Sequence, residues 1–395
     1  MKDALSRAAV STVLGRVSTG QIEVIEGGRR RVYGPDSAEL RATVTINDPA
    51  AWRGPLRGSV GLGEAYVDGL WETDDLVALI QIAARELREL DGLRGAVARP
   101  RAALHKLRGL VPENTKPRAR EHISAHYDLG NDLFAAFLDE RMMYSCAYYP
   151  SADATLEQAQ LAKLDRICDR LQLAPENHLL EIGTGWGGMA IHAARRSGCR
   201  VTTTTISRAQ HEMAVQRVRD AGLEDQVTVL LEDYRDLEGR YDRLVSVEMI
   251  EAVGWQYFDE YFRRCDRLLS DDGAMLLQAI TIGDRIYEVE KGSRSFANTH
   301  VFPGGCLPSE SLITNCLQRV TDMRQVWVDD ITAHYPPTLA AWRERFFSAW
   351  DKLRDRGYDE RFRRLWDFYL SSSEAGFRER RINDIQALFA KPNFR

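Results

Sequence analysis

Apolar and polar positions follow two different patterns along the chain. Near the N-terminus, strand-like stretches occur at 24–25 and 42–46, interspersed with glycine-rich segments that favour turns, such as residues 61–71. Helical spacing returns over residues 74–90. This mixture predicts a small α+β domain, which we place at residues 1–93.

From residue 121 onward, short apolar runs alternate with amphipathic segments. Buried strands are expected at 179–182, 199–207, 226–234, 241–254 and 273–282. Helices are expected at 154–173, from Met189, from Gln210 and at 258–269. This alternation predicts an α/β fold, a Rossmann-like doubly wound parallel sheet that binds ligands at the carboxyl ends of its strands. The aromatic-rich residues 336–395 are expected to form helices that pack on this sheet, with most of the aromatic rings in the core.

The segment between these two patterns, residues 94–120, is basic and interrupted by proline. It contains eight Lys and Arg residues and a single acid, Glu113. One interpretation is a solvated tether between domains. The other is an arm attracted to anionic phospholipid, where each basic residue contributes about 1 kcal/mol near the surface. The sequence leaves both interpretations open.

Composition narrows the class of protein. The 395 residues carry 53 Lys and Arg against 58 Asp and Glu, a net charge of −5, which does not favour a nucleic-acid partner. No apolar run is long enough to cross a bilayer, and charged residues interrupt the start of the chain, so we expect a cytoplasmic protein without a signal peptide. Six cysteines without a Cys-x-x-Cys pair indicate neither a disulfide framework nor a metal site.

A glycine-rich turn, Glu181-Ile-Gly-Thr-Gly-Trp-Gly-Gly188, lies between a predicted strand and a predicted helix. The missing side chains let the backbone approach a ligand, and the helix N-terminus supplies N–H donors. Such a turn fits NAD, FAD or S-adenosylmethionine. Its spacing differs from the G-x-G-x-x-G of dinucleotide sites, and the next strand ends in Thr205, Ser207 and Gln210 without an acid for a ribose diol. Both features favour S-adenosylmethionine.

Several motifs in a fixed order make a family resemblance specific. They are 126–132 (HYDLGND), 143–148 (MYSCAY), the glycine turn, 205–210 (TISRAQ), 248–254 (EMIEAVG) and 302–308 (FPGGCLP). In this order they resemble the cyclopropane-fatty-acyl-phospholipid synthases and their mycolic-acid relatives, over residues 121–395. The first 120 residues resemble the N-terminal domain of the bacterial synthases only loosely.

The resemblance implies an S-adenosylmethionine-dependent methyltransferase acting on a cis double bond of an unsaturated acyl chain in a membrane phospholipid. The alkene takes the methyl group, and the resulting carbocation loses a proton to give a cyclopropane. Residues 121–395 would then be the methyltransferase domain, with C-terminal helical lipid-binding elements, working as a peripheral enzyme at the inner membrane face. The expected cofactor-binding residues are Tyr144, Ser145, Glu181, Gly183, Gly185, Gly187, Thr205, Gln210, Asp233 and Tyr234. Asp233 would meet the adenine amine and Tyr234 the adenine face.

The carbocation requires a dry, aromatic-lined slot, because water would quench it. Tyr144, Tyr148, Tyr335 and the C-terminal aromatic residues are the candidates for such a slot, since a cation is stabilised over an aromatic face.

The proton loss requires a base, and the resemblance implies a bound bicarbonate ion. The expected catalytic residues are Cys146, Glu251, Gln278, Ile280 and Tyr335. Glu251 would accept a hydrogen bond from the bicarbonate O–H. One of the two residues Glu248 and Glu251 is expected to have only a structural role. Gln278 stands where well-known bacterial synthases carry histidine, and glutamine can donate a hydrogen bond but cannot shuttle a proton, so bicarbonate use stays open. Taken alone, Cys146 could also be a small buried hydrophobic residue.

Three other hypotheses remain. If the cation migrates before it loses a proton, the product is a methylene-branched chain (10-methylene, a precursor of 10-methyl), which a separate reductase could convert. A small-molecule N- or O-methyltransferase would need a general base and no membrane arm. A non-catalytic lipid-binding protein is opposed by the joint presence of the glycine turn, Thr205, Gln210 and Glu251. The N-terminal domain is expected to assist docking or the formation of a homodimer.

Overall fold

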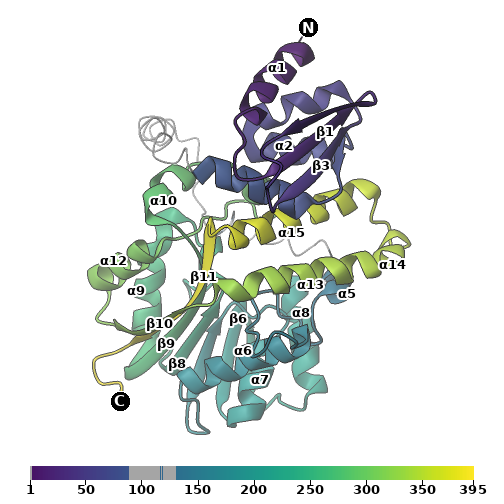
Figure 1. Cartoon of the computed structure of the whole chain (residues 1–395). Helices are drawn as coiled ribbons and strands as arrows, with labels where there is room; N and C mark the ends of the chain where they lie inside the picture. The colour runs from purple at the N-terminus through teal and green to yellow at the C-terminus, as the bar shows by residue number, and fades with distance from the viewer. Residues whose placement is uncertain (1, 89–115, 117, 119–129) are drawn as a thin grey trace. The chain divides into compact units, whose positions relative to one another are not determined.

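The computed structural model describes residues 2–88, 116, 118 and 130–395 (Figure 1). Contacts divide the chain into two compact units, each built from three segments. The first unit consists of Met1–Leu110, Glu288–Val301 and Leu339–Ile382. The second consists of Val111–Tyr287, Phe302–Thr338 and Asn383–Arg395. Apart from Lys116 and Arg118, the predicted basic linker at 94–120 lies outside the described residues, so its two interpretations stay predictions.

The first unit contains a four-stranded sheet of order β2-β1-β3-β4. Its strands are β1 (Gln21–Glu26), β2 (Arg29–Tyr33), β3 (Arg41–Ile46) and β4 (Trp71–Thr73). β1 runs antiparallel to β2 and parallel to β3. Ile22 and Val24 pair with Ala42 and Val44, and all four side chains are buried, so one face of the sheet forms a core. The predicted strands at 24–25 and 42–46 are confirmed.

Helices form the rest of the first unit. They are α1 (Lys2–Leu14), α2 (Gly58–Val67), residues 76–88, α11 (Phe296–His300), most of α13 (Tyr335–Ser348), α14 (Trp350–Arg354) and α15 (Glu360–Arg378). Short 3-10 helices are η1 (Pro49–Arg53) and η2 (Pro55–Arg57). The prediction of a helix over residues 74–90 is confirmed where the structure describes it.

The glycines of residues 61–71 have two different roles. Gly69 has a φ of +74° and lies in the turn between α2 and β4, as predicted. Gly61 and Gly63 lie inside α2, so the prediction that they separate strands is wrong. A Cβ on Gly63 would lie 2.3 Å from Phe296 Cδ2, and one on Gly61 would lie 2.5 Å from the Gly54 carbonyl oxygen. Gly61 and Gly63 therefore permit close packing of α2 rather than a change of chain direction.

The C-terminal aromatic residues build the core of the first unit. Trp342, Phe346, Trp366, Phe368 and Tyr369 are buried, as predicted. Contacts group their helices with the N-terminal segment, however, and not with the parallel sheet on which packing was expected. The physical reason is the packing of α15 on α2, where Tyr66 donates to Asp367 Oδ2 (2.6 Å) and its ring lies against Phe368 (5.8 Å between centroids).

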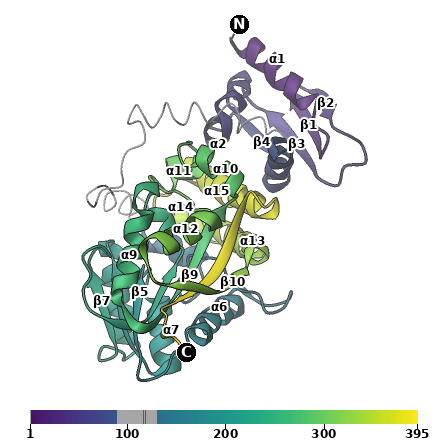
Figure 2. The ribbon, with the colours of Figure 1, turned by 90° about the vertical axis from the view of Figure 1, so that its left-hand side faces the viewer.

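The second unit contains a seven-stranded sheet of order β10-β11-β9-β8-β5-β6-β7 (Figure 2). The strands are β5 (His178–Ile182), β6 (Arg200–Thr205), β7 (Val227–Leu231), β8 (Tyr241–Val247), β9 (Leu269–Ile282), β10 (Arg324–Asp330) and β11 (Ile382–Ala390). β5 to β9 pair in parallel, which confirms the predicted α/β fold with a Rossmann-like sheet. β10 and β11 pair antiparallel, and neither was predicted. β11 lies within residues 336–395, which were expected to be helical.

Helices cover both faces of this sheet. They are α5 (Asn131–Phe137), α6 (Leu156–Arg170), α7 (Gly188–Ser197), α8 (Arg208–Asp220), α9 (Phe258–Leu268), α10 (Asp284–Glu290, whose end joins the first unit) and α12 (Glu310–Val320), with 3-10 helices η3 (Ile250–Ala252), η4 (Trp255–Tyr257) and η5 (Thr332–His334). One hydrophobic cluster joins α9 and α12 to the sheet through Leu180. Another joins α6 and α7 to the sheet through the adjacent Leu179, as the alternation of side chains along a strand requires. Among the described residues, no helix is long and apolar enough to cross a membrane.

Candidate active site

The glycine-rich turn connects β5 to α7 in the second unit. Gly183, Gly185 and Gly187 have φ angles of +103°, +53° and +84°, a region that L side chains rarely adopt. A Cβ on Gly185 would meet nothing within 4 Å, whereas a Cβ on Gly183 would lie 3.2 Å from Met249. The backbone of the turn is therefore accessible to a ligand at Gly185. At Gly183 it lies close to Met249, in the segment that follows β8.

The segment after α5 is held against this turn. Arg217 of α8 donates from Nη1 to the carbonyl oxygens of Trp186 (2.8 Å) and Arg141 (3.1 Å). The Trp186 indole N–H donates to Asn131 Oδ1 (2.8 Å), so a residue of the predicted 126–132 motif orients the turn. A Cβ on Gly188 would lie 2.4 Å from the Arg141 carbonyl oxygen, which explains the second glycine of the pair.

Glu181 is a buried carboxyl group below the turn. Its Oε2 accepts a hydrogen bond from Thr203 Oγ1 (2.6 Å), and Thr203 also lies 2.7 Å from Thr184 Oγ1. Burial raises the pKa of Glu181 to about 8, with the Thr203 hydrogen bond opposing the shift. The contact with Thr203 leaves the predicted cofactor role of Glu181 as a prediction.

The end of β6 brings together the polar residues that were predicted there. Thr205 Oγ1 donates to Gln210 Oε1 (2.9 Å) and accepts from the Ser207 backbone N–H (3.1 Å). Ser207 is the N-cap of α8, because its hydroxyl oxygen accepts from the Gln210 N–H (3.2 Å). The three side chains stabilise one another at the start of a helix, at the carboxyl edge where ligands bind in such sheets.

Asp233 and Tyr234 follow β7, and the Asp233 carboxylate already has a strong partner. Arg235 donates from Nε to Oδ1 (2.8 Å) and from Nη2 to Oδ2 (2.7 Å), a bidentate pair. The pKa of Asp233 is lowered, because the Arg235 hydrogen bonds outweigh the opposing effect of burial. The Tyr234 ring packs edge-on against Tyr261 (5.5 Å between centroids). Their predicted adenine contacts stay predictions.

Aromatic rings surround the segment that carries Tyr144 to Tyr148. Tyr144 lies within 5.2 Å of Phe134 and 6.3 Å of Phe302, measured between ring centroids. Tyr148 lies 4.5 Å from the His334 ring, and the Arg166 guanidinium carbon lies 4.5 Å from its centroid. Tyr148 therefore already stabilises a cation of the protein itself.

Glu248 is the hydrogen-bond acceptor at the centre of the predicted anion cradle. Its Oε1 accepts from the Cys146 backbone N–H (2.8 Å) and from Gln278 Nε2 (2.8 Å). Its Oε2 accepts from the Tyr335 hydroxyl (2.5 Å). Both oxygens thus act only as acceptors in these contacts, as they do in a carboxylate. Three of the five predicted catalytic residues therefore converge on a chain carboxylate that was not assigned a catalytic role.

Glu251 and Ile280 form a second, separate contact. Glu251 Oε1 accepts from the Ile280 backbone N–H (2.5 Å), and Glu251 Oε2 is buried without a hydrogen-bond partner among the described residues. Burial raises the pKa of Glu251 to about 8, and the charge of Glu248 adds to the shift. Glu251 is therefore mostly protonated at neutral pH.

Gln278 is held by a chain of side-chain hydrogen bonds. Arg166 Nε donates to Gln386 Oε1 (2.9 Å), and Gln386 Nε2 donates to Gln278 Oε1 (3.1 Å). Because its oxygen accepts from Gln386, the Gln278 amide nitrogen is turned toward Glu248 and toward Asp384 Oδ2 (3.1 Å). The amide therefore acts as a donor to the carboxylates, a role that needs no proton transfer.

Buried charged and titratable groups that were not predicted complete this cluster. Lys163 of α6 donates to Ser145 Oγ (2.6 Å), and burial lowers its pKa while the charge of Glu248 opposes the shift. Asp384 of β11 is fully buried, and burial and the charge of Glu248 raise its pKa well above its ordinary value. Burial likewise raises the pKa of the Cys146 thiol, so its contribution at neutral pH comes from its backbone N–H.

The sequence contained a usable signal for only some of these residues. Lys163 lies on the buried face of an amphipathic helix, four residues after Ala159 and four before Ile167. A lysine at such a position must find a partner. Asp384 gave no comparable signal, because its strand was not predicted. His126, the first residue of its motif, lies outside the described residues.

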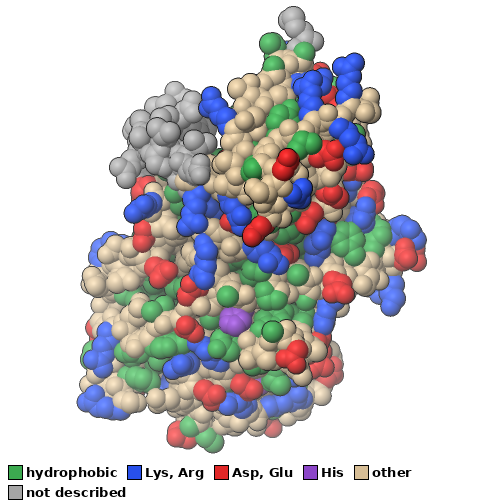
Figure 3. Space-filling view, in the orientation of Figure 1, with side chains coloured by type: hydrophobic (Ala, Val, Ile, Leu, Met, Phe, Trp, Pro, Cys, Tyr) green, Lys and Arg blue, Asp and Glu red, His purple; other side chains and the backbone are tan. Residues whose placement is uncertain are grey.

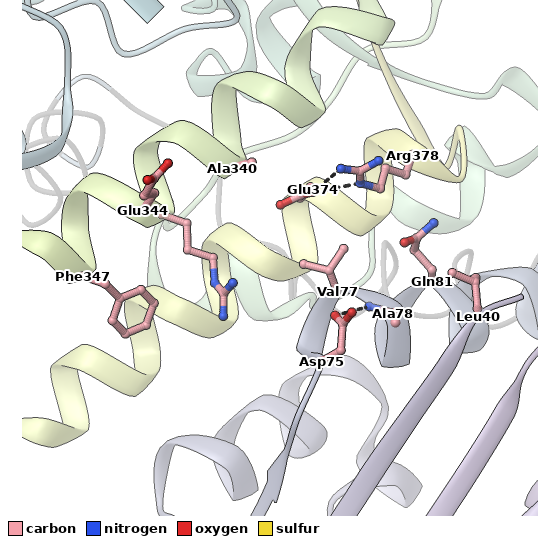
Figure 4. Close-up of a pocket in the computed structure, with 11 residues that line it drawn as sticks. Leu40, Asp75, Val77, Ala78, Gln81, Ala340, Glu344, Phe347, Glu374 and Arg378 are labelled. Carbon is pink, nitrogen blue, oxygen red and sulfur yellow. Dashed lines mark hydrogen bonds and ion pairs between the residues drawn. The ribbon is translucent and has the colours of Figure 1, made fainter.

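A cavity of about 400 Å³ lies in the first unit (Figure 4). It is lined by Leu40, Asp75, Val77, Ala78, Gln81, Ala340, Arg343, Glu344, Phe347, Glu374 and Arg378. Arg343 donates to Asp367 (2.6 Å) and Arg378 donates to Glu374 (2.8 Å), so both arginines have carboxylate partners. No predicted site residue lines this cavity, and the candidate active site is the cluster in the second unit.

Comparisons with known proteins agree with this site. The family model for mycolic acid cyclopropane synthetase matches residues 114–387. The chain belongs to this family. It is 40% identical over 345 residues to the tuberculostearic acid methyltransferase UfaA1 of Mycobacterium tuberculosis, covering 84% of this chain and 78% of the relative. It is 40% identical over 353 residues to the cyclopropane-fatty-acyl-phospholipid synthase of Escherichia coli K12, covering 89% of this chain and 88% of the relative.

A solved structure extends the similarity to the fold. The mycolic acid cyclopropane synthase CmaA1, complexed with SAH and CTAB, superposes with a TM-score of 0.64 at 30% identity, over 69% of this chain and 98% of CmaA1. The family resemblance drawn from the ordered motifs is therefore confirmed. The chain is a methyltransferase of the cyclopropane synthase type, while the roles of individual residues stay predictions.

Proposed function

We propose that this enzyme transfers the methyl group of S-adenosylmethionine to a cis double bond of an unsaturated fatty acyl chain in a phospholipid, and that the product is a cyclopropane. The observation that carries the proposal is the position of the Glu248 cluster. Glu248 directly precedes Met249, and a Cβ built on Gly183 would lie 3.2 Å from Met249, so the segment that carries Glu248 lies beside the glycine turn. The proton loss that follows methyl transfer to an alkene requires a proton acceptor near the cofactor, and the half-buried Glu248 is in this position.

The residues around the turn fit S-adenosylmethionine. Gly183, Gly185 and Gly187 would let the backbone approach the cofactor, and the pair of Thr205 and Gln210 lies at the end of the neighbouring strand. S-Adenosylmethionine, when bound, supplies an electrophilic methyl sulfonium. The role of the chain is to hold that methyl group in line with the alkene and to keep water out.

Proton removal is the step in which the buried cluster would act. Attack by the alkene needs no base, because the double bond itself supplies the electron pair. The carbocation that follows loses a proton from the carbon that was transferred, and a carboxylate next to that carbon accepts it. The hydrogen bonds from Cys146, Gln278 and Tyr335 to Glu248 support this role, since these donors fix the carboxylate in one orientation.

A methylene-branched product is the second candidate, and the equal identity to UfaA1 and to the cyclopropane synthase favours keeping it. Both products lose a proton from the transferred carbon. The methylene product requires that a hydride first move to the neighbouring carbon, so that the cation becomes tertiary. The timing of proton removal therefore decides between the two, and a separate reductase would act only on the methylene product.

We also propose that the enzyme works as a peripheral protein at the inner membrane face. On the face drawn in Figure 3, basic and acidic side chains are interspersed over the described residues, so this face offers no single-sign patch for anionic lipid. The eight Lys and Arg residues of 94–120 would supply the attraction instead. Vesicle binding by these residues should decrease at high salt.

The proposed function is tested with methyl-labelled S-adenosylmethionine and phospholipid vesicles. Vesicles with cis-unsaturated chains should acquire label in their acyl esters, and matched vesicles with saturated chains should not. Proton NMR then separates ring protons from exocyclic methylene protons, because the two products have the same mass. No label in the acyl chains would refute the proposal. Such a result is what the small-molecule methyltransferase and lipid-binding hypotheses predict.

A further inference from the structure

We propose that Glu248 is the base that accepts the proton from the transferred carbon, and that this enzyme therefore needs no bicarbonate. The inference rests on the proposed function and concerns how the proton leaves. In this mechanism the carboxylate of Glu248 takes the place of an external anion.

The donors of the expected bicarbonate cradle are all engaged by chain carboxylates. The Cys146 N–H, the Gln278 amide and the Tyr335 hydroxyl donate to Glu248, at 2.8, 2.8 and 2.5 Å. The remaining donor, the Ile280 N–H, donates to Glu251 at 2.5 Å. A bicarbonate ion placed here would have to displace both carboxylates, or bind without these donors and next to the Glu248 charge. The residues therefore do not fit bicarbonate.

The backbone at Glu248 is built to place its side chain in this position. Glu248 has a φ of +47°, a left-handed conformation that is costly for a residue with a Cβ. The conformation is held by the Glu248 N–H, which donates to the Gln278 carbonyl oxygen (2.8 Å). The same two residues are therefore joined twice, once through the backbone and once through the side chains. Strain that is kept at such a site indicates a functional constraint on the side chain.

The surrounding charges are compatible with a single basic carboxylate. Burial and the nearby charge of Glu248 raise the pKa values of both Asp384 and Glu251, which favours the neutral forms of these two carboxyl groups beside Glu248. Lys163 is buried nearby and its interaction with Glu248 is attractive. An added bicarbonate would bring a further negative charge to a cluster that already holds the carboxyl groups of Glu248, Glu251 and Asp384.

The proton transfer balances within the proposed reaction. A C–H bond of the transferred carbon breaks, and its electron pair forms the C–C bond that closes the ring on the cationic carbon. The proton bonds to a carboxylate oxygen of Glu248, which becomes a neutral carboxylic acid. After product release the proton passes to water, so one proton is released for each methyl group transferred.

The first test removes bicarbonate from the wild-type reaction. The full-length enzyme is assayed for label transfer into cis-unsaturated vesicles, in degassed CO2-free buffer and again with added bicarbonate. We expect equal rates, within about twofold. A wild-type enzyme that loses activity without bicarbonate and regains it on addition would overturn the inference while leaving the proposed function intact. No transfer under either condition would contradict the proposed function instead.

The second test uses chemical rescue of Glu248 variants. Glu248→Gln should lower turnover by about 100-fold or more, because the isosteric amide cannot accept the proton. Glu248→Ala should be equally slow, but formate or bicarbonate should restore part of its activity, since the donors of Cys146, Gln278 and Tyr335 are then free. Glu238→Gln, a change of an exposed glutamate in the same unit, is the matched control and should behave as wild type.

Binding of S-adenosylhomocysteine and thermal unfolding are measured for every variant, to separate loss of chemistry from loss of the fold. Full activity of Glu248→Gln in CO2-free buffer would overturn the inference. Loss of Glu248→Ala activity without rescue by either anion would also count against it, provided that the variant binds S-adenosylhomocysteine. If Glu248→Ala does not fold, the isosteric Gln variant and the wild-type experiment still decide.

Discussion

Replacing Glu251 by glutamine should change the pH dependence of stability in a direction that the structure fixes. Glu251 is half-buried with its Oε2 shielded from solvent, and its pKa is raised from an ordinary value of 4.5 to about 8 in the folded protein. Between these two values the unfolded chain releases a proton that the folded chain keeps. The folded state therefore binds more protons than the unfolded state, and its stability decreases as the pH rises through this window.

The magnitude follows from the width of the window. One pH unit corresponds to about 1.36 kcal/mol, so a shift from 4.5 to about 8 corresponds to at most about 5 kcal/mol. Glutamine cannot ionise and avoids this cost, while its side-chain oxygen can still accept from the Ile280 N–H. Glutamine brings an N–H2 group to the position of Oε2, which has no partner among the described residues, so we expect a cost of about 1 kcal/mol at all pH values.

The assay is urea unfolding of wild type and Glu251→Gln at several pH values between 5 and 8.5. We expect the variant to be slightly less stable than wild type near pH 5 and more stable near pH 8.5. Glu181 also has a pKa raised to about 8, but it is present in both proteins and cancels in the difference. A stability difference that does not vary with pH would refute the reasoning, because it would mean that Glu251 titrates alike in the folded and unfolded states.

Three further predictions address the donors, the cofactor turn and the first unit. Tyr335→Phe removes the 2.5 Å hydrogen bond to Glu248, and turnover measured with labelled cofactor should decrease by about 10-fold or more while S-adenosylhomocysteine affinity stays within about twofold. Arg217→Ala removes the hydrogen bond to the Trp186 carbonyl oxygen, so calorimetry should show S-adenosylhomocysteine binding that is weaker by about 10-fold. Unchanged affinity would argue against a role of Arg217 in cofactor binding. Gly63→Ala would place a Cβ 2.3 Å from a Phe296 ring carbon, and urea unfolding should show a loss of about 1–3 kcal/mol, whereas an unchanged midpoint would mean that the ring moves freely.

The strands and the family could be predicted from the sequence because both depend on local patterns. Leu179, Leu180 and Ile182 are apolar and precede glycines, and this is enough to indicate a buried strand and a turn. β11 has no such pattern. Asp384 and Gln386 are fully buried in it, and polar residues inside an apolar run do not resemble a core strand. The partners that make their burial tolerable, Gln278 and Arg166, lie more than 100 residues away in the chain.

The candidate site shows the same limit at the level of single residues. The motif at 248–254 located the two carboxyl groups. Their roles depend on the backbone at Glu248, and its left-handed φ cannot be deduced from the amino-acid sequence alone. Asp233 was assigned to an adenine contact by its position after a strand. The bidentate pair that the following Arg235 makes with this carboxylate could not be deduced from its position. Patterns predict where polar residues gather, whereas hydrogen-bond geometry decides which of them are engaged.

The position of β11 between β9 and β10 also has a consequence for folding. Residues 339–382 belong to the first unit, and the chain returns to the seven-stranded sheet only with residues 383–395. Asp384 and Gln386, and with them the orientation of the Gln278 amide, are thus supplied only when β11 docks. Until then β9 and β10 lack the strand that lies between them. A chain in which β11 has not docked can bury much of its core and still present no organised carboxylate cluster, so catalytic competence would depend on this single pairing step.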